Sequence, residues 1–274
     1  MKISYHMHST GSDGALGPEQ VILEAIESGI THMCFTDHYN TPDNLDKASI
    51  NFYPESHYQE ILKLKEKYKD KMDISIGVEL DWIKGYSTWC EKEAKKRKYD
   101  HVIGSVHGLL INKGEFIGIW SHEKLQRMID ALGGKKEFVK EYYGQMRDMI
   151  KSGFFDTVGH LDVIKFRNQD DWLFSEEDDW YRKEVLKTLD VLKDSKMCLE
   201  INTKGIIVNG EEKQYPSEWI VLAAKKRNIP ITIGTDFHRT KDNIHLDKAY
   251  ELARRVGYKS IFIFKNRKPV EMKL

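Results

Sequence analysis

The stretch Ile3–His8 (ISYHMH) shows a pattern that recurs along the whole chain. It is short, apolar and rich in residues that favour strands, and it ends in two histidines. Similar segments follow at intervals, with stretches of helical character between them. They are His32–His38, Ile74–Trp82, His101–His107, Thr157–Asp162, Met197–Thr203, Ile231–His238 and, near the C-terminus, Ser260–Phe264.

Amphipathic helices are predicted between these segments. Pro18 stands at the start of one helix, where a missing backbone N–H costs nothing. Ile61, Leu64 and Tyr68 recur at helical spacing and form the apolar stripe of the next. The segment Ser175–Asp178 resembles a capping box, which predicts that another helix begins there.

Strand and helix alternate from one end of the chain to the other, which predicts an α/β fold with a parallel sheet. Seven repeats favour a closed or nearly closed barrel over an open sheet. An α/β barrel of roughly 250 residues fits this length as one domain, so we expect a single domain over residues 1–274. The irregular insert Lys113–Lys140 is expected to form a lid, and the polar segment Asn40–Ser56 a second long connection over the same end.

The composition excludes several classes of protein. The 43 Lys and Arg residues balance the 43 Asp and Glu residues, which argues against binding to bulk nucleic acid or to an anionic membrane. No apolar run approaches the roughly 20 residues of a membrane helix, and the N-terminal stretch lacks an apolar signal core. Three cysteines without a CxxC pair indicate a reduced, cytoplasmic protein.

The positions of the histidines are more informative than their number. Residue types that bind metals stand at the ends of nearly all the strand-like segments: His6, His8, His38, Glu79, His107, His160, Asp236 and His238, with Asp13 in the loop after the first segment. In a parallel barrel the carboxyl ends of all strands open on one face, so these side chains are expected to converge there. Alternation along a strand places His6 and His8 on one face, and likewise Asp236 and His238.

Such a cluster points to metal ions. Each strand-end histidine, taken singly, is more often a satisfied core or loop residue, but six of them at the ends of five strands favour a site. Buried imidazoles and carboxylates without a metal are costly to desolvate, and His, Asp and Glu without Cys suit zinc, manganese or iron. Nine ligands fit three divalent ions, an arrangement suited to phosphoryl transfer. The remaining histidines receive no metal role: His32, His57, His101, His122 and His245.

The motifs around these residues resemble those of a known family. HMHSTGSDG (6–14), FTDH (35–38), GVELDW (77–82), GSVHG (104–108), VGHLD (158–162) and IGTDFH (233–238) resemble the successive motifs of the PHP (polymerase and histidinol phosphatase) superfamily, most closely its histidinol-phosphate phosphatase branch. Residues 142–168 and 199–217 strengthen the resemblance, which covers nearly the whole chain. It implies a distorted (β/α)7 barrel, similar to a TIM barrel, with a trinuclear metal site at the carboxyl ends of the strands.

The resemblance also implies how the ligands divide among the three metals. One metal would be held by His6, His8, Glu79 and Asp236. Glu79 would bridge to a second metal, which is also held by His107 and His160. The third would be held by Asp13, His38 and His238. Asp13 stands where some family members have histidine, a difference that changes metal preference more than geometry.

The activity implied by the resemblance is hydrolysis of L-histidinol phosphate, a phosphomonoester of histidine biosynthesis, with a small-molecule substrate as the partner. Glu79, Asp236 and His238 are the expected catalytic residues, and the last two are alternative candidates for protonating the leaving alkoxide. Arg167 and Lys204 are expected to hold the phosphate group from loops after the fifth and sixth strands.

Two segments depart from the pattern of the branch. The segment Asn202–Val208 lacks a basic residue expected near Ile207, for which Lys204 is the candidate substitute. The segment Gly108–Trp120 lacks the aromatic residue that usually follows the histidine. The alternative functions are therefore a PHP phosphatase or phosphodiesterase for a nucleotide or sugar phosphate, or a degenerate domain that binds without catalysis. The complete set of nine ligands disfavours the degenerate domain.

Overall fold

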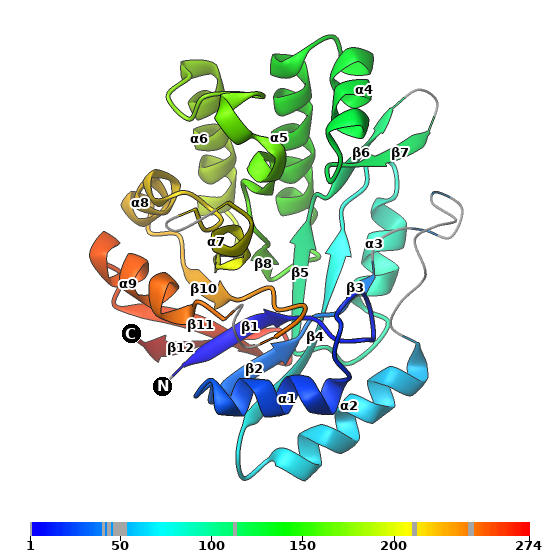
Figure 1. Ribbon diagram of the computed structural model, residues 1–274, viewed down its shortest axis with the longest axis vertical. Helices are drawn as coiled ribbons and strands as arrows, with labels where there is room; N and C mark the ends of the chain where they lie inside the picture. The colour runs from blue at the N-terminus through cyan, green and yellow to red at the C-terminus, as the bar shows by residue number, and fades with distance from the viewer. Residues whose placement is uncertain are drawn as a thin grey trace.

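The computed structural model describes residues 2–39, 42, 45, 54–111, 114–209, 213–240 and 244–274. A parallel sheet lies at its centre (Figure 1). The strands follow one another in the order β1 (Ile3–Met7), β2 (His32–Phe35), β4 (Asp73–Asp81), β5 (His101–Ser105), β8 (Thr157–Val158), β9 (Cys198–Asn202) and β10 (Ile231–Gly234). A short strand, β3 (His38–Tyr39), pairs with β4 beyond the end of β2.

Strands β1 and β10 close this sheet into a nearly complete barrel. Beyond β10 the chain runs beside β1, where the amide of Asp236 donates to the carbonyl of His6 at 2.9 Å and the amide of His8 to that of Phe237 at 2.9 Å. All neighbouring strands of the barrel that pair are parallel. The predicted α/β barrel of seven parallel strands is therefore confirmed.

Most strands are shorter than the sequence pattern predicts, and most residues of the expected cluster lie just past strand ends. β5 ends at Ser105, before His107, and β8 ends at Val158, before His160. β10 ends at Gly234, and Asp236 has a φ of 51°, which a strand residue does not adopt. Asp236 and His238 do come together as expected, with Oδ1 of Asp236 3.2 Å from Nδ1 of His238. Alternation along a strand is the wrong reason, because both residues follow the strand.

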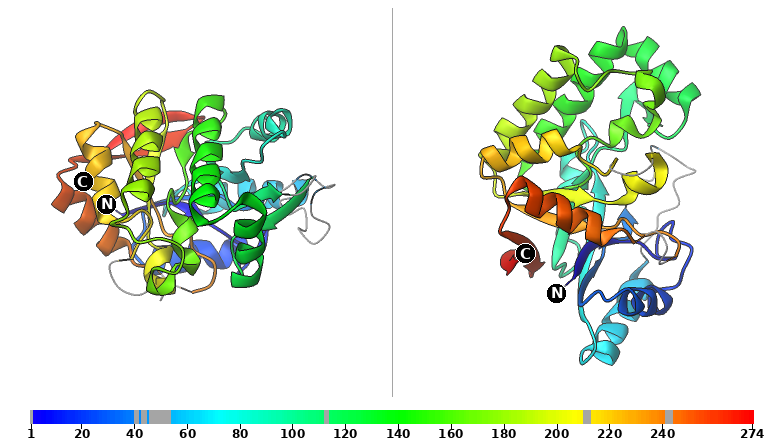
Figure 2. Two further views of the ribbon diagram at one scale, coloured as in Figure 1. Left: turned by 90° about the horizontal axis from the view of Figure 1, so that it is seen from above. Right: turned by 60° about the vertical axis from the view of Figure 1, so that its left-hand side comes forward.

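Helices cover the outside of the sheet (Figures 1 and 2). They are α1 (Pro18–Glu27), α2 (Glu55–Tyr68), α3 (Ser87–Ala94), α5 (Lys135–Ser152), α6 (Asp179–Lys193), α8 (Glu218–Lys226) and α9 (Leu246–Val256). Pro18 is the first residue of α1, as predicted, and the stripe of Ile61, Leu64 and Tyr68 is buried in α2. Across the described ranges, none of the helices combines the length and the apolar character needed to cross a membrane.

The insert Lys113–Lys140 is regular, so the expectation of an irregular segment is wrong. Its described residues include all of β7 (Glu115–Gly118), which pairs with β6 (Gly108–Ile111) in a hairpin. They also form the helix α4 (His122–Leu132) and the start of α5. Leu109 and Ile117 of the hairpin are buried, as is the stripe of Leu125, Met128 and Ile129 in α4, and this packing explains the regularity. The second expected connection, Asn40–Ser56, lies mostly outside the described residues.

The end of the barrel away from the hairpin of β6 and β7 is covered by a second hairpin, β11 (Ser260–Lys265) and β12 (Lys268–Lys273). The ring of Phe264 stacks on His101, the first residue of β5, with ring centroids 4.7 Å apart. The hydroxyl of Tyr5 in β1 donates to the carbonyl of Phe264 at 3.3 Å. One continuous cluster of buried apolar side chains joins β1 to β11. We propose on this basis that residues 1–274 form a single domain.

Phe264→Ala tests whether this hairpin belongs to the same cooperative unit as the barrel. Phe264 is 2% exposed, so we expect its truncation to lower the free energy of unfolding by about 3–5 kcal/mol. The measurement is chemical denaturation followed by both fluorescence and circular dichroism. Val270→Ala, at a side chain on β12 that is 39% exposed, should change stability by less than about 0.5 kcal/mol. Two separate transitions in the wild type would contradict a single domain.

Candidate metal centre

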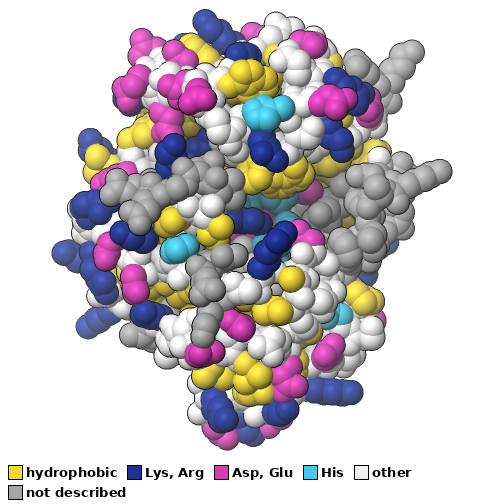
Figure 3. All heavy atoms as spheres, in the orientation of Figure 1, with side chains coloured by type: hydrophobic (Ala, Val, Ile, Leu, Met, Phe, Trp, Pro, Cys, Tyr) yellow, Lys and Arg dark blue, Asp and Glu magenta, His cyan; other side chains and the backbone are white. Residues whose placement is uncertain are grey.

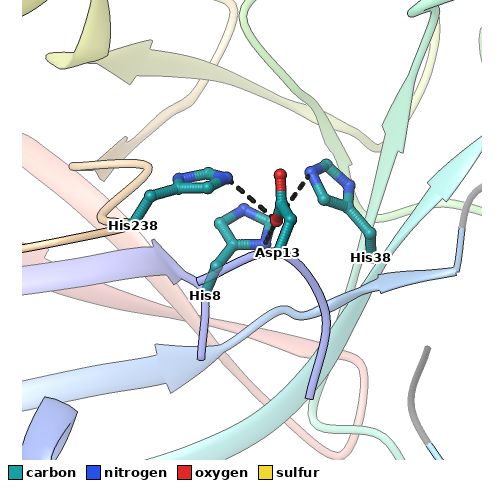
Figure 4. A group of neighbouring side chains, drawn as sticks. All are labelled: His8, Asp13, His38 and His238. Atoms are coloured by element: carbon teal, nitrogen blue, oxygen red, sulfur yellow. Dashed lines mark ion pairs between the residues drawn. The ribbon is translucent and has the colours of Figure 1, made fainter. Parts of the chain in front are cut away.

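All nine residues expected to bind metals converge at the carboxyl ends of the barrel strands. Their ligand atoms fall into four overlapping groups of three or four, in each of which the atoms lie within 4.8 Å of one another. The groups are His8, Asp13, His38 and His238; His6, His8 and Asp236; His6, Glu79 and His160; and His38, Glu79 and His107. The first group is drawn in Figure 4, where the three imidazoles surround the carboxylate of Asp13.

Glu79 lies at the centre of the cluster and is 1% exposed. Its Oε2 lies 3.0 Å from Nε2 of His6 and 3.0 Å from Nδ1 of His38. Its Oε1 lies 3.0 Å from Nε2 of His160 and 3.4 Å from Nε2 of His107. The two oxygens of one carboxylate therefore face different sets of imidazoles, as a residue that joins two neighbouring sites must do.

Two aspartates complete the cluster, and both contact His238. Asp236 Oδ1 lies 3.4 Å from Nε2 of His8 and 3.2 Å from Nδ1 of His238. Asp13 Oδ1 lies 3.1 Å from Nε2 of His238 and 3.7 Å from Nε2 of His38. The turn after β10 and the loop after β1 thus reach the same point, although their residues are far apart in sequence.

Glu200 of β9 supports the cluster from beneath, a role that the sequence analysis missed. Its Oε1 accepts a hydrogen bond from Nδ1 of His6 at 2.7 Å. Its Oε2 accepts from the backbone amide of His160 at 2.8 Å and from the side-chain amide of Asn202 at 3.1 Å. A carboxylate that accepts from Nδ1 leaves Nε2 of the imidazole to bind a metal. The signal in the sequence is a single charged residue inside the apolar strand CLEIN (198–202).

A second support holds the loop that carries Asp13. The buried carboxylate of Asp37 accepts from the amide of Ser9 at 2.7 Å and from the hydroxyl of Ser12 at 2.8 Å. His57 Nε2 lies 2.9 Å from the other oxygen of Asp37. In the described part of the chain, His57 and the other four histidines without a predicted metal role belong to no metal-binding group. Through its contact with Asp37, His57 nevertheless helps to hold the loop that carries Asp13.

The surroundings of the cluster keep its carboxylates charged. Burial raises the pKa of Glu79, but the imidazoles around it, His6 first, outweigh this effect and hold the pKa well below its usual value. The pKa of Asp236 is also held well below its usual value, because Lys204 and His6 outweigh burial. Burial and neighbouring imidazoles lower the pKa of His8 to about 3. Charged carboxylates and a neutral imidazole are the states in which these groups bind metals.

A cavity of about 420 Å³ opens over the cluster, and Figure 3 shows histidine side chains in the hollow, with Lys or Arg side chains beside them. Lys204, the first residue of α7 (Lys204–Asn209), lines it and places its Nζ 3.0 Å from Oδ1 of Asp236. Arg167, the last residue of the 3-10 helix Val163–Arg167, also lines it, but its Nε donates to the carbonyl of Trp120 at 2.9 Å. Lys204 is thus in contact with the cluster, whereas Arg167 is bonded to Trp120 in the cavity wall.

Comparison with known proteins agrees with this geometry. Residues 4–204 match the model of the PHP domain. The chain belongs to the PHP domain family. The probable histidinol-phosphatase of Deinococcus radiodurans is 29% identical to it, over 96% of both chains. The histidinol-phosphatase of Lactococcus lactis is 28% identical, over 97% of this chain and 96% of that protein.

A solved structure resembles the whole of this PHP-family chain. It is histidinol phosphate phosphatase of Lactococcus lactis complexed with zinc, L-histidinol and phosphate, with a TM-score of 0.81 and 25% identity over 98% of each chain. The likeness covers the strands that carry the cluster as well as the hairpins at both ends of the barrel, because it extends over nearly the full length.

Glu200→Gln tests the support beneath His6. Both oxygens of Glu200 accept hydrogen bonds, Oε1 from one donor and Oε2 from two, so an amide NH₂ would face a donor in either orientation and at least one bond would be lost. We expect metal affinity or turnover to fall by about 10- to 100-fold, measured by competition with a chelator and by phosphate release. Glu184→Gln is the matched control, because this buried carboxylate pairs with Arg147 at 2.9 Å in another part of the fold. Unchanged metal affinity in Glu200→Gln would contradict the positioning role.

Proposed function

We propose that this chain is a metal-dependent phosphomonoesterase that hydrolyses L-histidinol phosphate to L-histidinol and phosphate, a reaction of histidine biosynthesis in the cytoplasm. The observation that carries the proposal is the full-length likeness to a histidinol phosphate phosphatase, combined with a cluster of nine metal-ligand residues under one cavity. The substrate is a small molecule, and the chain's balanced charge gives no reason to expect nucleic acid.

The residues of the cluster fit bound divalent ions. Six imidazoles and three carboxylates without a thiolate form a donor set suited to zinc, manganese or iron. We propose three ions, held as the family resemblance implies, with Glu79 shared between two of them. When bound, such ions activate water and neutralise the charge that develops on phosphoryl oxygens.

The chain's own residues then bind and orient the phosphate and deliver one proton to the leaving group. Lys204 Nζ stands beside Asp236 and His238 at the edge of the cluster, so its charge can hold a phosphate oxygen there. Asp236 and His238 are the candidates for delivering a proton to the alkoxide that leaves. Arg167, which also lines the cavity, is proposed as a second cation that binds the phosphate. Glu79 is proposed to act by holding the cluster together.

A related activity on another small phosphoester, such as a nucleotide or sugar phosphate, is the second candidate. It is favoured by the two departures in the substrate loops. The side chain of Ile207, near which the branch has a basic residue, is 42% exposed on α7. Gly108 follows His107 where the branch has an aromatic residue.

Elemental analysis tests the metal proposal. We expect close to three divalent ions per chain in active protein, and loss of activity on chelation that is restored by zinc or manganese. Glu79→Gln should lower the stoichiometry and reduce turnover by several orders of magnitude, because it removes a ligand from two sites at once. His122→Ala, at a histidine on α4 outside the cluster, should leave both unchanged. One ion or none in fully active enzyme would overturn the three-metal site.

Comparison of substrates tests the reaction. We expect kcat/KM for L-histidinol phosphate to exceed that for p-nitrophenyl phosphate by at least about a hundredfold, because polar groups built for the amine and imidazole stay unpaired with the analogue. Lys204→Ala should raise KM for both compounds by roughly ten- to a hundredfold. Lys95→Ala, at an exposed side chain on the outer helical layer, serves as the control. Equal efficiency on the two compounds would favour the second candidate function.

A further inference from the structure

The cavity over the metal cluster has one aromatic wall. Phe116, Trp120, Phe166 and Tyr215 all line it. Trp120 is 42% exposed, which makes it the most exposed aromatic side chain in the described part of the chain. The other strongly exposed large apolar residues, such as Leu222 and Val270, do not line this cavity. A large indole face that is left open to the cavity is a surface that gains stability when a flat, apolar ligand covers it.

Contacts on two sides fix the position of Trp120. Its ring lies 5.3 Å from that of His107, at an angle of 37°, and meets Phe166 edge-on with centroids 5.1 Å apart. Its carbonyl accepts the hydrogen bond from Arg167. The indole therefore spans the distance from a residue of the metal cluster to the outer wall of the cavity.

The backbone explains why the wall is built from the hairpin. A Cβ atom at Gly108 would lie 2.4 Å from the carbonyl oxygen of Ile117 and 2.6 Å from Cζ of Phe116. Residue 108 therefore cannot carry a side chain while the hairpin keeps this geometry. The strand that returns supplies Phe116 and Trp120 instead, so the aromatic surface beside His107 comes from a different segment of the chain.

Two parts of the cavity lining differ in chemistry. Lys204 Nζ lies 3.0 Å from Asp236 and 3.1 Å from His238, so this part suits a phosphate group. Trp120, Phe116 and Phe166 line the same cavity and offer ring faces and edges. A molecule that carries both a phosphate and a planar ring matches both parts at once.

On the basis of the proposed function, we infer that Trp120, with Phe116 and Phe166, forms the subsite that binds the planar ring of the leaving alcohol. Trp120 is then a specificity-determining residue: it selects substrates by their ring and takes no part in the bond-breaking step. The phosphate binds beside Lys204, where every phosphomonoester is treated alike.

The test compares Trp120→Ala and Trp120→Phe on L-histidinol phosphate, phenyl phosphate and O-phosphoethanolamine, which keeps an amine and a phosphate but has no ring. We expect Trp120→Ala to lower kcat/KM for both ring-bearing compounds by about tenfold or more, mainly through KM. The value for O-phosphoethanolamine should change by less than about twofold, because that compound has no ring to bind the indole. Trp120→Phe should retain most of the selectivity, and Leu222→Ala, an exposed apolar residue away from the cavity, should behave as the wild type.

The outcomes separate this subsite from the proposed function. An equal loss of kcat/KM on all three compounds, or reduced metal content in Trp120→Ala, would show that Trp120 only holds His107 in place. Either result would overturn the subsite. No loss on any compound would overturn it as well. If the wild type prefers phenyl phosphate to L-histidinol phosphate and Trp120→Ala removes its preference for rings, the subsite stands while the histidinol assignment fails. A wild type that hydrolyses none of the three compounds with metal added would overturn both.

Discussion

The arrangement of the site depends on one charged carboxylate that is buried at the carboxyl ends of the barrel strands. Glu79 is almost inaccessible to water, and an ionised carboxylate in such a place is expensive unless partners surround it. Five imidazoles and the hydroxyl of Ser105 lie around its two oxygens. These imidazoles come from four different segments, so the strand order of the whole barrel is needed to place them. Positive charge from bound ions would complete the balance.

The supports beneath the cluster form a second layer with the same logic. Glu200 and Asp37 are buried acids that accept backbone and side-chain hydrogen bonds from the segments carrying the ligands. Gly234 shows how closely this layer is packed, because a Cβ atom there would lie 2.0 Å from Oε1 of Glu200. The residues that face the cavity are therefore held in position by buried residues that do not line it.

The barrel and the ligands could be predicted from sequence because their signal repeats. Each apolar segment ends in a residue such as His107 or His160, and parallel topology turns that repetition into convergence. The strand limits were predicted less well, since residues such as Asp236 leave the ladder in order to face the cluster. The hairpin within Gly108–Trp120 was misjudged because its two strands of four residues are too short to show a clear period.

The residues that support the cluster and the aromatic wall of the cavity could not be predicted from the sequence for another reason. Glu200 and His57 act through partners far away in the sequence, at separations that no local spacing encodes. Arg167 and Lys204 illustrate the same limit, because both are plausible phosphate-binding cations by sequence. In the structure Lys204 contacts Asp236 of the cluster, whereas Arg167 donates to the carbonyl of Trp120.

The closure of the barrel floor by the hairpin of β11 and β12 has a practical consequence. The two ends of the chain lie near each other on the side of the fold away from α4 and the hairpin of β6 and β7 (Figures 1 and 2). A tag, a surface linker or a fusion partner joined to either end would therefore leave the cavity open to solution. The same proximity makes the fold suited to circular permutation, with old ends joined by a short bridge. The protein can thus be anchored to a solid support with its reactive face directed outward.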